Sequence, residues 1–99
     1  MSEFLLEFYL PRGNERGAAA DSESARMAAE TLARSGREIR FCRLIFLPDE
    51  ETCFVLFEAD SAELVRDAAL LAKLPPDRIS AVSPHPGGRP RDARPWHKR

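Results

Sequence analysis

Hydrophobic positions along the chain fall into four short runs and two longer periodic stretches. Residues 3–10, 39–47, 52–59 and 78–83 are rich in Leu, Phe, Ile and Val, the side chains that favour β-strands. Pro11 closes the first run, and an acidic turn at residues 48–51 separates the second run from the third, which predicts a β-hairpin. Four strands are therefore expected.

The two periodic stretches predict helices, one before the hairpin and one after it. In the first stretch, apolar residues recur three and four positions apart, the spacing of one helical face: Ala25, Ala28, Ala29 and Leu32. This helix is expected to end near Ser35, because Gly36 suits a left-handed residue after the last turn. In the second stretch, Asp60 is expected to cap the helix and Pro75 to end it.

The order strand, helix, strand, strand, helix, strand is the split βαβ pattern. The expected fold class is α+β: a ferredoxin-like βαββαβ domain over residues 1–84, in which two helices cover one face of a four-stranded antiparallel sheet. Residues 85–99 combine Pro, Gly and Arg with one large apolar side chain, so a disordered basic tail is expected there.

The hairpin predicts which side chains share a face of the sheet. If the turn closes it symmetrically, opposed residues have numbers that sum to about 99, and the opposed pairs are Phe46–Cys53, Leu44–Val55 and Cys42–Phe57. These pairs are apolar, so they are assigned to the face that the helices cover. Cys42 and Cys53 then share this face but lie about 13 Å apart along the strands, which is too far for a disulfide.

The face of the sheet without helices, called the open face below, is expected to be unusually apolar. Its expected apolar members are Leu5, Tyr9, Phe41, Ile45, Phe54 and Leu56. Together they would expose on the order of several hundred Å², which is near the upper limit for a monomer. Two copies are therefore expected to pack through this face, as in a dimeric α/β-barrel assembly.

Glu7, Tyr9, Arg43 and Glu58 are the candidate ligand-binding residues, because they place polar groups within this apolar face. Arg43 is expected to lie diagonally across the hairpin from Glu58. Two interpretations stay open: an interface ion pair that fixes the register of two sheets, and a small-molecule or metal pocket between them. A metal site would combine Glu7, Glu58 and His85.

The distribution of charge and the absence of several known motifs argue against some classes of function. The net charge is −1, and residues 85–99 carry five cations and one acid, so the tail is +4 and the body −5. An acidic body argues against nucleic acid as a partner. No apolar run reaches the roughly 20 residues of a membrane span, and no export signal is apparent, so a cytoplasmic location is expected. The sequence has no phosphate-binding glycine loop, HExxH motif, CxxC pair or nucleophile elbow.

Three segments, FLLEFYLP, LPDEETCFVLFEAD and LPPDRI, resemble a family of small actinobacterial proteins. The family includes a nickel-binding, nickel-responsive dimer of ferredoxin-like fold, and the likeness covers roughly residues 3–83. The resemblance implies a homodimer and Ni²⁺ as a ligand, and Glu7 and Tyr9 match an E-x-Y pattern of the family's first strand. Family positions that hold a Cys and a His are occupied here by Val55 and Ala68, which have no ligand atoms.

The leading interpretation is a non-enzymatic, dimeric binding protein with a small-ligand or divalent-metal site on the open face. One alternative is an enzyme similar to the dimeric α/β-barrel monooxygenases and isomerases, which need little or no cofactor. In that case Glu7 or Glu58 would act as general base, and Arg43 would stabilise a developing anion. The other alternative is a purely structural interaction module.

Overall fold

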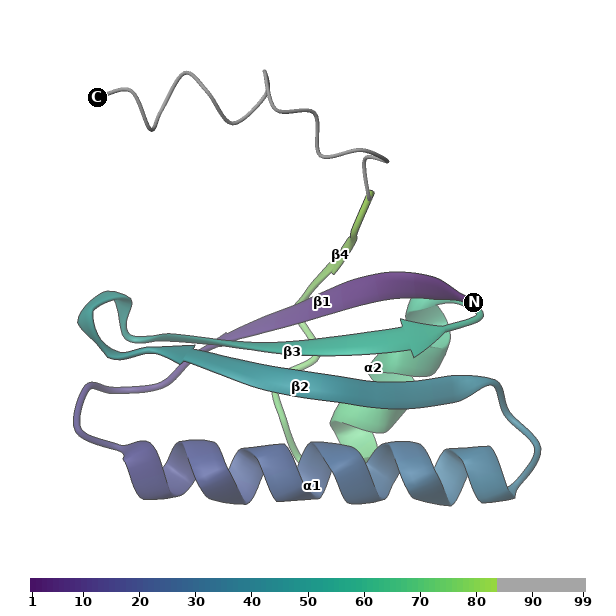
Figure 1. Cartoon of the computed structure of the whole chain (residues 1–99), viewed down its shortest axis with the longest axis horizontal. Helices are drawn as coiled ribbons and strands as arrows, with labels where there is room; N and C mark the ends of the chain where they lie inside the picture. Colours follow the sequence, from purple (N-terminus) through teal and green to yellow (C-terminus); the bar gives the residue numbers. More distant parts are fainter. Residues whose placement is uncertain (84–99) are drawn as a thin grey trace.

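The computed structural model describes residues 1–83, which form one antiparallel sheet and two α-helices (Figure 1). The elements are β1 (Ser2–Tyr9), α1 (Glu15–Arg34), β2 (Ile39–Leu47), a short 3₁₀ turn (Pro48–Glu50), β3 (Thr52–Ala59), α2 (Ala62–Leu71) and β4 (Arg78–Ala81). The strands lie in the order β2-β3-β1-β4. The predicted α+β, ferredoxin-like fold is confirmed. The predicted tail and the domain boundary at residue 84 lie outside the described residues.

A side-chain cap begins α1. The backbone N–H of Gly17 donates a hydrogen bond to the side-chain oxygen of Asn14 over 3.0 Å. A Cβ at position 17 would lie 2.6 Å from atoms of the Asn14 side chain, so glycine is what leaves room for this cap. At the other end Gly36 has a φ of +97°, the left-handed conformation expected from the sequence.

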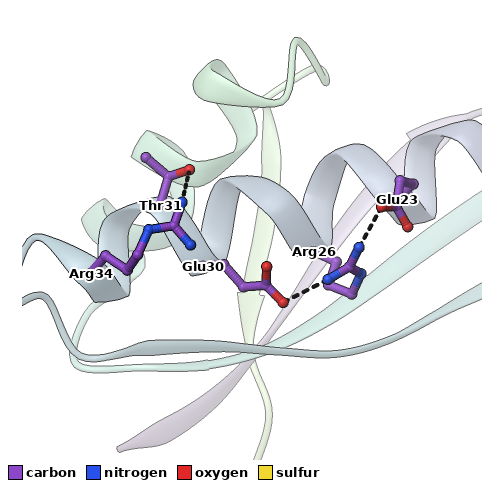
Figure 2. A network of polar contacts seen from close by, with 5 residues as sticks. All are labelled: Glu23, Arg26, Glu30, Thr31 and Arg34. Atoms are coloured by element: carbon purple, nitrogen blue, oxygen red, sulfur yellow. Dashed lines mark hydrogen bonds and ion pairs between the residues drawn. The ribbon is translucent and has the colours of Figure 1, made fainter.

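Charged and polar side chains of α1 form two groups of contacts within the helix (Figure 2). Arg26 pairs with Glu23 and Glu30, and its contact with Glu30 measures 2.6 Å. One turn further on, Arg34 donates a hydrogen bond to the hydroxyl of Thr31 over 3.4 Å. These groups keep the outer face of α1 in water, so its apolar face is the one that meets the sheet.

The cap of α2 differs from the prediction. Ser61, not Asp60, precedes the first helical residue, and its hydroxyl accepts a hydrogen bond from the backbone N–H of Leu64 over 3.2 Å. The serine adopts the extended backbone conformation that an N-cap needs. Because Ser61 is the N-cap, Glu63 is the second helical residue and not the third, so Asp60 and Glu63 do not form the expected capping box.

The core lies between the helices and one face of the sheet. Helix α1 contacts β2 and β3, while α2 contacts α1, β1, β3 and β4. Figure 1 shows α1 running along the sheet beneath β2 and β3. The largest fully buried side chains come mainly from the two central strands: Phe57, Leu6, Val55, Val65 and Cys53.

A β-bulge interrupts the hairpin at Cys42, which corrects the predicted register. Phe46–Cys53 and Leu44–Val55 are opposed as expected, but the register shifts between Phe41 and Arg43, and Phe41 rather than Cys42 faces Phe57. The Phe41 and Phe57 rings meet edge to face, with centroids 6.2 Å apart. One extra residue in a strand moves each earlier residue of that strand to the other face of the sheet. Phe41 therefore lies on the covered face.

Candidate functional site

The open face of the sheet carries an apolar centre between two sets of charges. Leu5 and Leu56 are opposed across β1 and β3, and Ile45 and Phe54 are opposed across β2 and β3. All four side chains are partly exposed, and neither helix covers this face. Around them the same alternation places three acids and three arginines on the open face: Glu3, Glu7, Glu58, Arg40, Arg43 and Arg78.

Glu58 pairs with Arg40, not with Arg43 as predicted. The bulge brings Arg40 directly opposite Glu58, and its guanidinium Nη2 lies 2.6 Å from the Glu58 carboxylate. A second guanidinium nitrogen, Nε, donates to the same oxygen over 3.2 Å. The paired hydrogen bonds and charges raise the pKa of Arg40 above its ordinary value. Arg43 lies opposite Leu56 and diagonally across from Glu58, as expected, and it is exposed.

Glu7 and Tyr9 lie at the other end of the open face. Glu7 is opposed to Arg78 across β1 and β4, with 3.7 Å between carboxylate and guanidinium. The Tyr9 side chain is 67% exposed. Both residues line a hollow of about 430 Å³ that also includes Asp77 and Arg78, and whose other walls are Phe8, Glu50, Glu51, Thr52 and Pro75.

The structure therefore divides the four predicted ligand-binding residues into two groups. Glu7 faces Phe54 of β3, four residues before Glu58, so the two carboxylates are separated by about 13 Å along the strands. Arg43 lies two strands away from Glu7, or roughly 10 Å. Within one chain, Glu7 and Tyr9 line the same hollow, whereas Arg43 and Glu58 are not among its walls.

Three charged residues of this face were missed in the sequence. Arg40 was overlooked because the bulge was not expected, although a signal was present: Phe41 and Leu44 are both large and apolar, yet they are three positions apart. Glu3 faces Glu58 in the sheet, and Arg78 faces Glu7. The alternation of β1 alone places Glu3 on the open face, but finding its neighbour required the register between the strands.

The described residues of one chain do not fit a nickel site. Among residues 1–83, no three His, Cys, Asp or Glu side chains come together in a way that could hold a metal ion. Val55 and Ala68 are both completely buried in the core and offer only hydrocarbon. The predicted metal ligand His85 lies outside the described residues.

The two cysteines occupy different environments, which corrects the prediction that both lie in the covered core. Cys53 is fully buried, and burial raises the pKa of its thiol to about 11. Cys42 lies in the bulge and is only partly buried; burial raises the pKa of its thiol, and the charges of Arg40 and Glu58 also act on it. Both thiols are free, and their raised pKa values disfavour the reactive thiolate.

The two carboxylates considered as general bases, Glu7 and Glu58, both have an arginine cation beside them. Arg43 is too far from Glu7 to stabilise an anion formed there within the same chain. An apolar centre with charged borders is instead what a protein interface or an intersheet ligand site requires.

Comparisons with known proteins agree with the fold and identify the family. The chain matches the model of the nickel responsive protein SCO4226-like family over residues 5–82. Its structure is similar to the crystal structure of SCO4226 from Streptomyces coelicolor A3(2), an actinobacterium, with a TM-score of 0.64 and 22% sequence identity over 85% of this chain and 99% of the other. No curated protein gives a significant match.

Neither helix within residues 1–83 is long and apolar enough to cross a membrane. The family match extends from within β1 to just beyond β4 and so includes both helices and every residue named on the open face except Glu3. It agrees with the resemblance seen in the sequence. The chain belongs to the nickel-responsive SCO4226-like family.

Proposed function

We propose that the chain is a non-enzymatic, homodimeric binding protein, in which two copies pack open face to open face and hold a ligand between them. The ligand is a small molecule or a divalent metal ion, with Ni²⁺ as the ion that the family description supports. The observation that carries the proposal is the composition of the open face: an apolar centre that no described helix covers, with three acids and three arginines around it.

The balance of charges supports a second copy as the partner of this face. A symmetric dimer uses the same surface twice, so that surface must be complementary to itself. Three carboxylates and three guanidinium groups sum to zero and allow such complementarity. The partly exposed leucines and phenylalanine at the centre would supply the buried apolar area of the interface.

The ligand site is proposed to include side chains from both copies. Glu7 and Glu58 of one chain are too far apart to bind one ion together, and no metal-binding set forms within residues 1–83 of a single chain. In a face-to-face dimer, groups of the second copy can meet those of the first. Binding of Ni²⁺ should therefore depend on dimerisation.

Sedimentation and calorimetry test this proposal together. At tens of micromolar, chelator-treated protein should sediment at about twice the 11.1 kDa of one chain and release or absorb heat with Ni²⁺ but not with Mg²⁺. Leu56→Glu, at the centre of the open face, should abolish both the dimer and the heat. Leu70→Glu is the control, because Leu70 is exposed on α2 and lies away from this face.

The outcomes separate the alternatives. A monomer of 11.1 kDa that still binds Ni²⁺ would contradict the intersheet site. A dimer that gives no heat with Ni²⁺ would exclude the nickel version and leave a small molecule as the proposed ligand. The cytoplasmic location expected from the sequence stays a prediction.

A further inference from the structure

Glu3 and Arg43 are the two charges of the open face that have no ion-pair partner within residues 1–83. Arg40 pairs with Glu58, and Arg78 pairs with Glu7. Glu3 faces Glu58 directly across β1 and β3. Like charges opposed in a sheet destabilise it unless a cation neutralises them, and here Arg40 neutralises only one of the two carboxylates. The open face thus has one acid and one base left over.

Glu3 and Arg43 are too far apart to form an ion pair with each other within one chain. Arg43 is on the edge strand β2 and Glu3 on β1, with β3 between them. Their positions are therefore separated by about 10 Å across the sheet, with a further offset along the strands. Arg43 lies beside Leu56, in line with the opposed pair Leu5–Leu56, whereas Glu3 lies two residues before Leu5 on β1.

A single two-fold axis can bring these two residues together across the interface. An axis that lies between two facing sheets, passes over the Leu5–Leu56 pair and runs obliquely to the strands brings Arg43 of one copy over Glu3 of the other. The same operation brings Glu3 over the second Arg43. It also places Leu56 over Leu5 of the other copy, and Glu7 close to Arg78 of the other copy.

We propose that Arg43 of each copy pairs with Glu3 of the other and that these two reciprocal ion pairs fix the register of the dimer. The inference rests on the proposed open-face homodimer and names the contacts that specify it. Packed sheets lie about 10 Å apart, a gap that a long arginine and a glutamate side chain span together. Each pair removes a charge that would otherwise enter the interface without a partner, which would be costly.

Charge reversal in two separate chains tests this pairing. Arg43→Glu places two acids at each contact of its own dimer, and Glu3→Arg places two arginines there. Each variant alone should dimerise at least about tenfold more weakly than the wild type. In an equimolar mixture, a heterodimer forms one reversed pair and one native pair, so sedimentation should recover dimer with an affinity within about threefold of the wild type.

Two control substitutions test whether the loss of dimer is specific to the Arg43–Glu3 pair. Arg66→Glu and Glu63→Arg produce the same changes of charge on α2, away from the open face, and should leave the dimer unchanged. Circular dichroism of all four variants tests whether each one folds. The mixture is the decisive sample, because a contact within one chain cannot be restored by a second chain.

The failures of the two proposals are distinguishable. A wild-type monomer would overturn the homodimer of the proposed function. A wild-type dimer with single variants that dimerise normally would overturn the Arg43–Glu3 pairing and leave the dimer in place. Single variants that are monomeric both alone and in the mixture would also overturn the pairing, because the two residues would then have other partners.

Discussion

Arg40 and Glu58 face each other across the β2–β3 hairpin, with 2.6 Å between the guanidinium Nη2 and the carboxylate. The pair exists because one extra residue, Cys42, is accommodated in β2. Without this bulge, Arg40 would point toward the helices and Glu58 would face another residue. The bulge thus determines which charges the open face carries. In one copy Glu58 is only 27% exposed, whereas Arg40 is 61% exposed, so Arg40 is the more accessible member of the pair.

Replacement of Arg40 by Ala should weaken the dimer more than it affects the fold. The exposed ion pair contributes little to a single folded chain, but in the proposed dimer Glu58 would be buried without its cation. We expect the dimer dissociation constant to rise by about tenfold or more. Analytical ultracentrifugation measures it. Arg37→Ala is the matched control, because Arg37 pairs with Asp67 of α2 on the helical side; an equal effect in both variants would contradict the prediction.

The fold could be predicted from the sequence because its signals are local. Alternation in β1, the helical period of α1 and the turn at residues 48–51 each depend on neighbouring residues, and all three predictions are confirmed. The start of α2 was placed one residue early, because Asp60 and Ser61 are both good capping residues. Only the backbone conformation of Ser61 decides between them.

The charged contacts could not be predicted in the same way, because they depend on pairing between strands. Alternation correctly placed Glu7, Arg43 and Glu58 on the open face. The partner of Glu58 depended on the bulge, and the partner of Glu7 on the register of β4. In retrospect, Phe41 and Leu44 reveal the bulge, since both can face the core only if an extra residue lies between them.

Replacement of Ser61 by Ala should destabilise the chain by about 1 kcal/mol, the usual cost of a lost N-cap. The hydroxyl of Ser61 accepts the hydrogen bond of the Leu64 N–H, and alanine leaves that donor without this partner. Urea denaturation measures the free energy of unfolding. Asp60→Ala serves as the control and should change it by much less, since Asp60 lies outside the cap. A larger loss in Asp60→Ala would show that the aspartate caps the helix after all.

Replacement of Gly17 by Ala should not give the stabilisation expected from the higher helix propensity of alanine. That gain is up to about 1 kcal/mol in a helix interior, but the new Cβ would lie 2.6 Å from the side chain of Asn14 and displace the cap. A double-mutant cycle isolates the contact. In an Asn14→Ala background there is no cap to displace, and Gly17→Ala should become stabilising. If the substitution has the same effect in both backgrounds, the two side chains do not compete for space.

Alkaline pH should destabilise the fold through Cys53. Burial raises the pKa of this thiol to about 11, the charge of Asp21 acts in the same direction, and a hydrogen bond from the Phe54 backbone opposes them. An unfolded cysteine titrates near pH 8.5. Between these two pH values the folded chain retains a proton that the unfolded chain has lost. The stabilisation is therefore complete below about pH 8.5 and is lost as the pH rises toward 11.

The size of the effect follows from the difference between the two pKa values. Two to three pH units correspond to roughly 3 kcal/mol of unfolding free energy as an upper limit. Urea denaturation at pH 8 and pH 10.5, with reductant present, should show a decrease in the wild type that is smaller in Cys53→Ala. All other titratable groups are the same in both proteins, so their contributions cancel in the comparison. Equal pH dependence of the two proteins would show that the thiol of Cys53 ionises as readily in the folded chain as in the unfolded one.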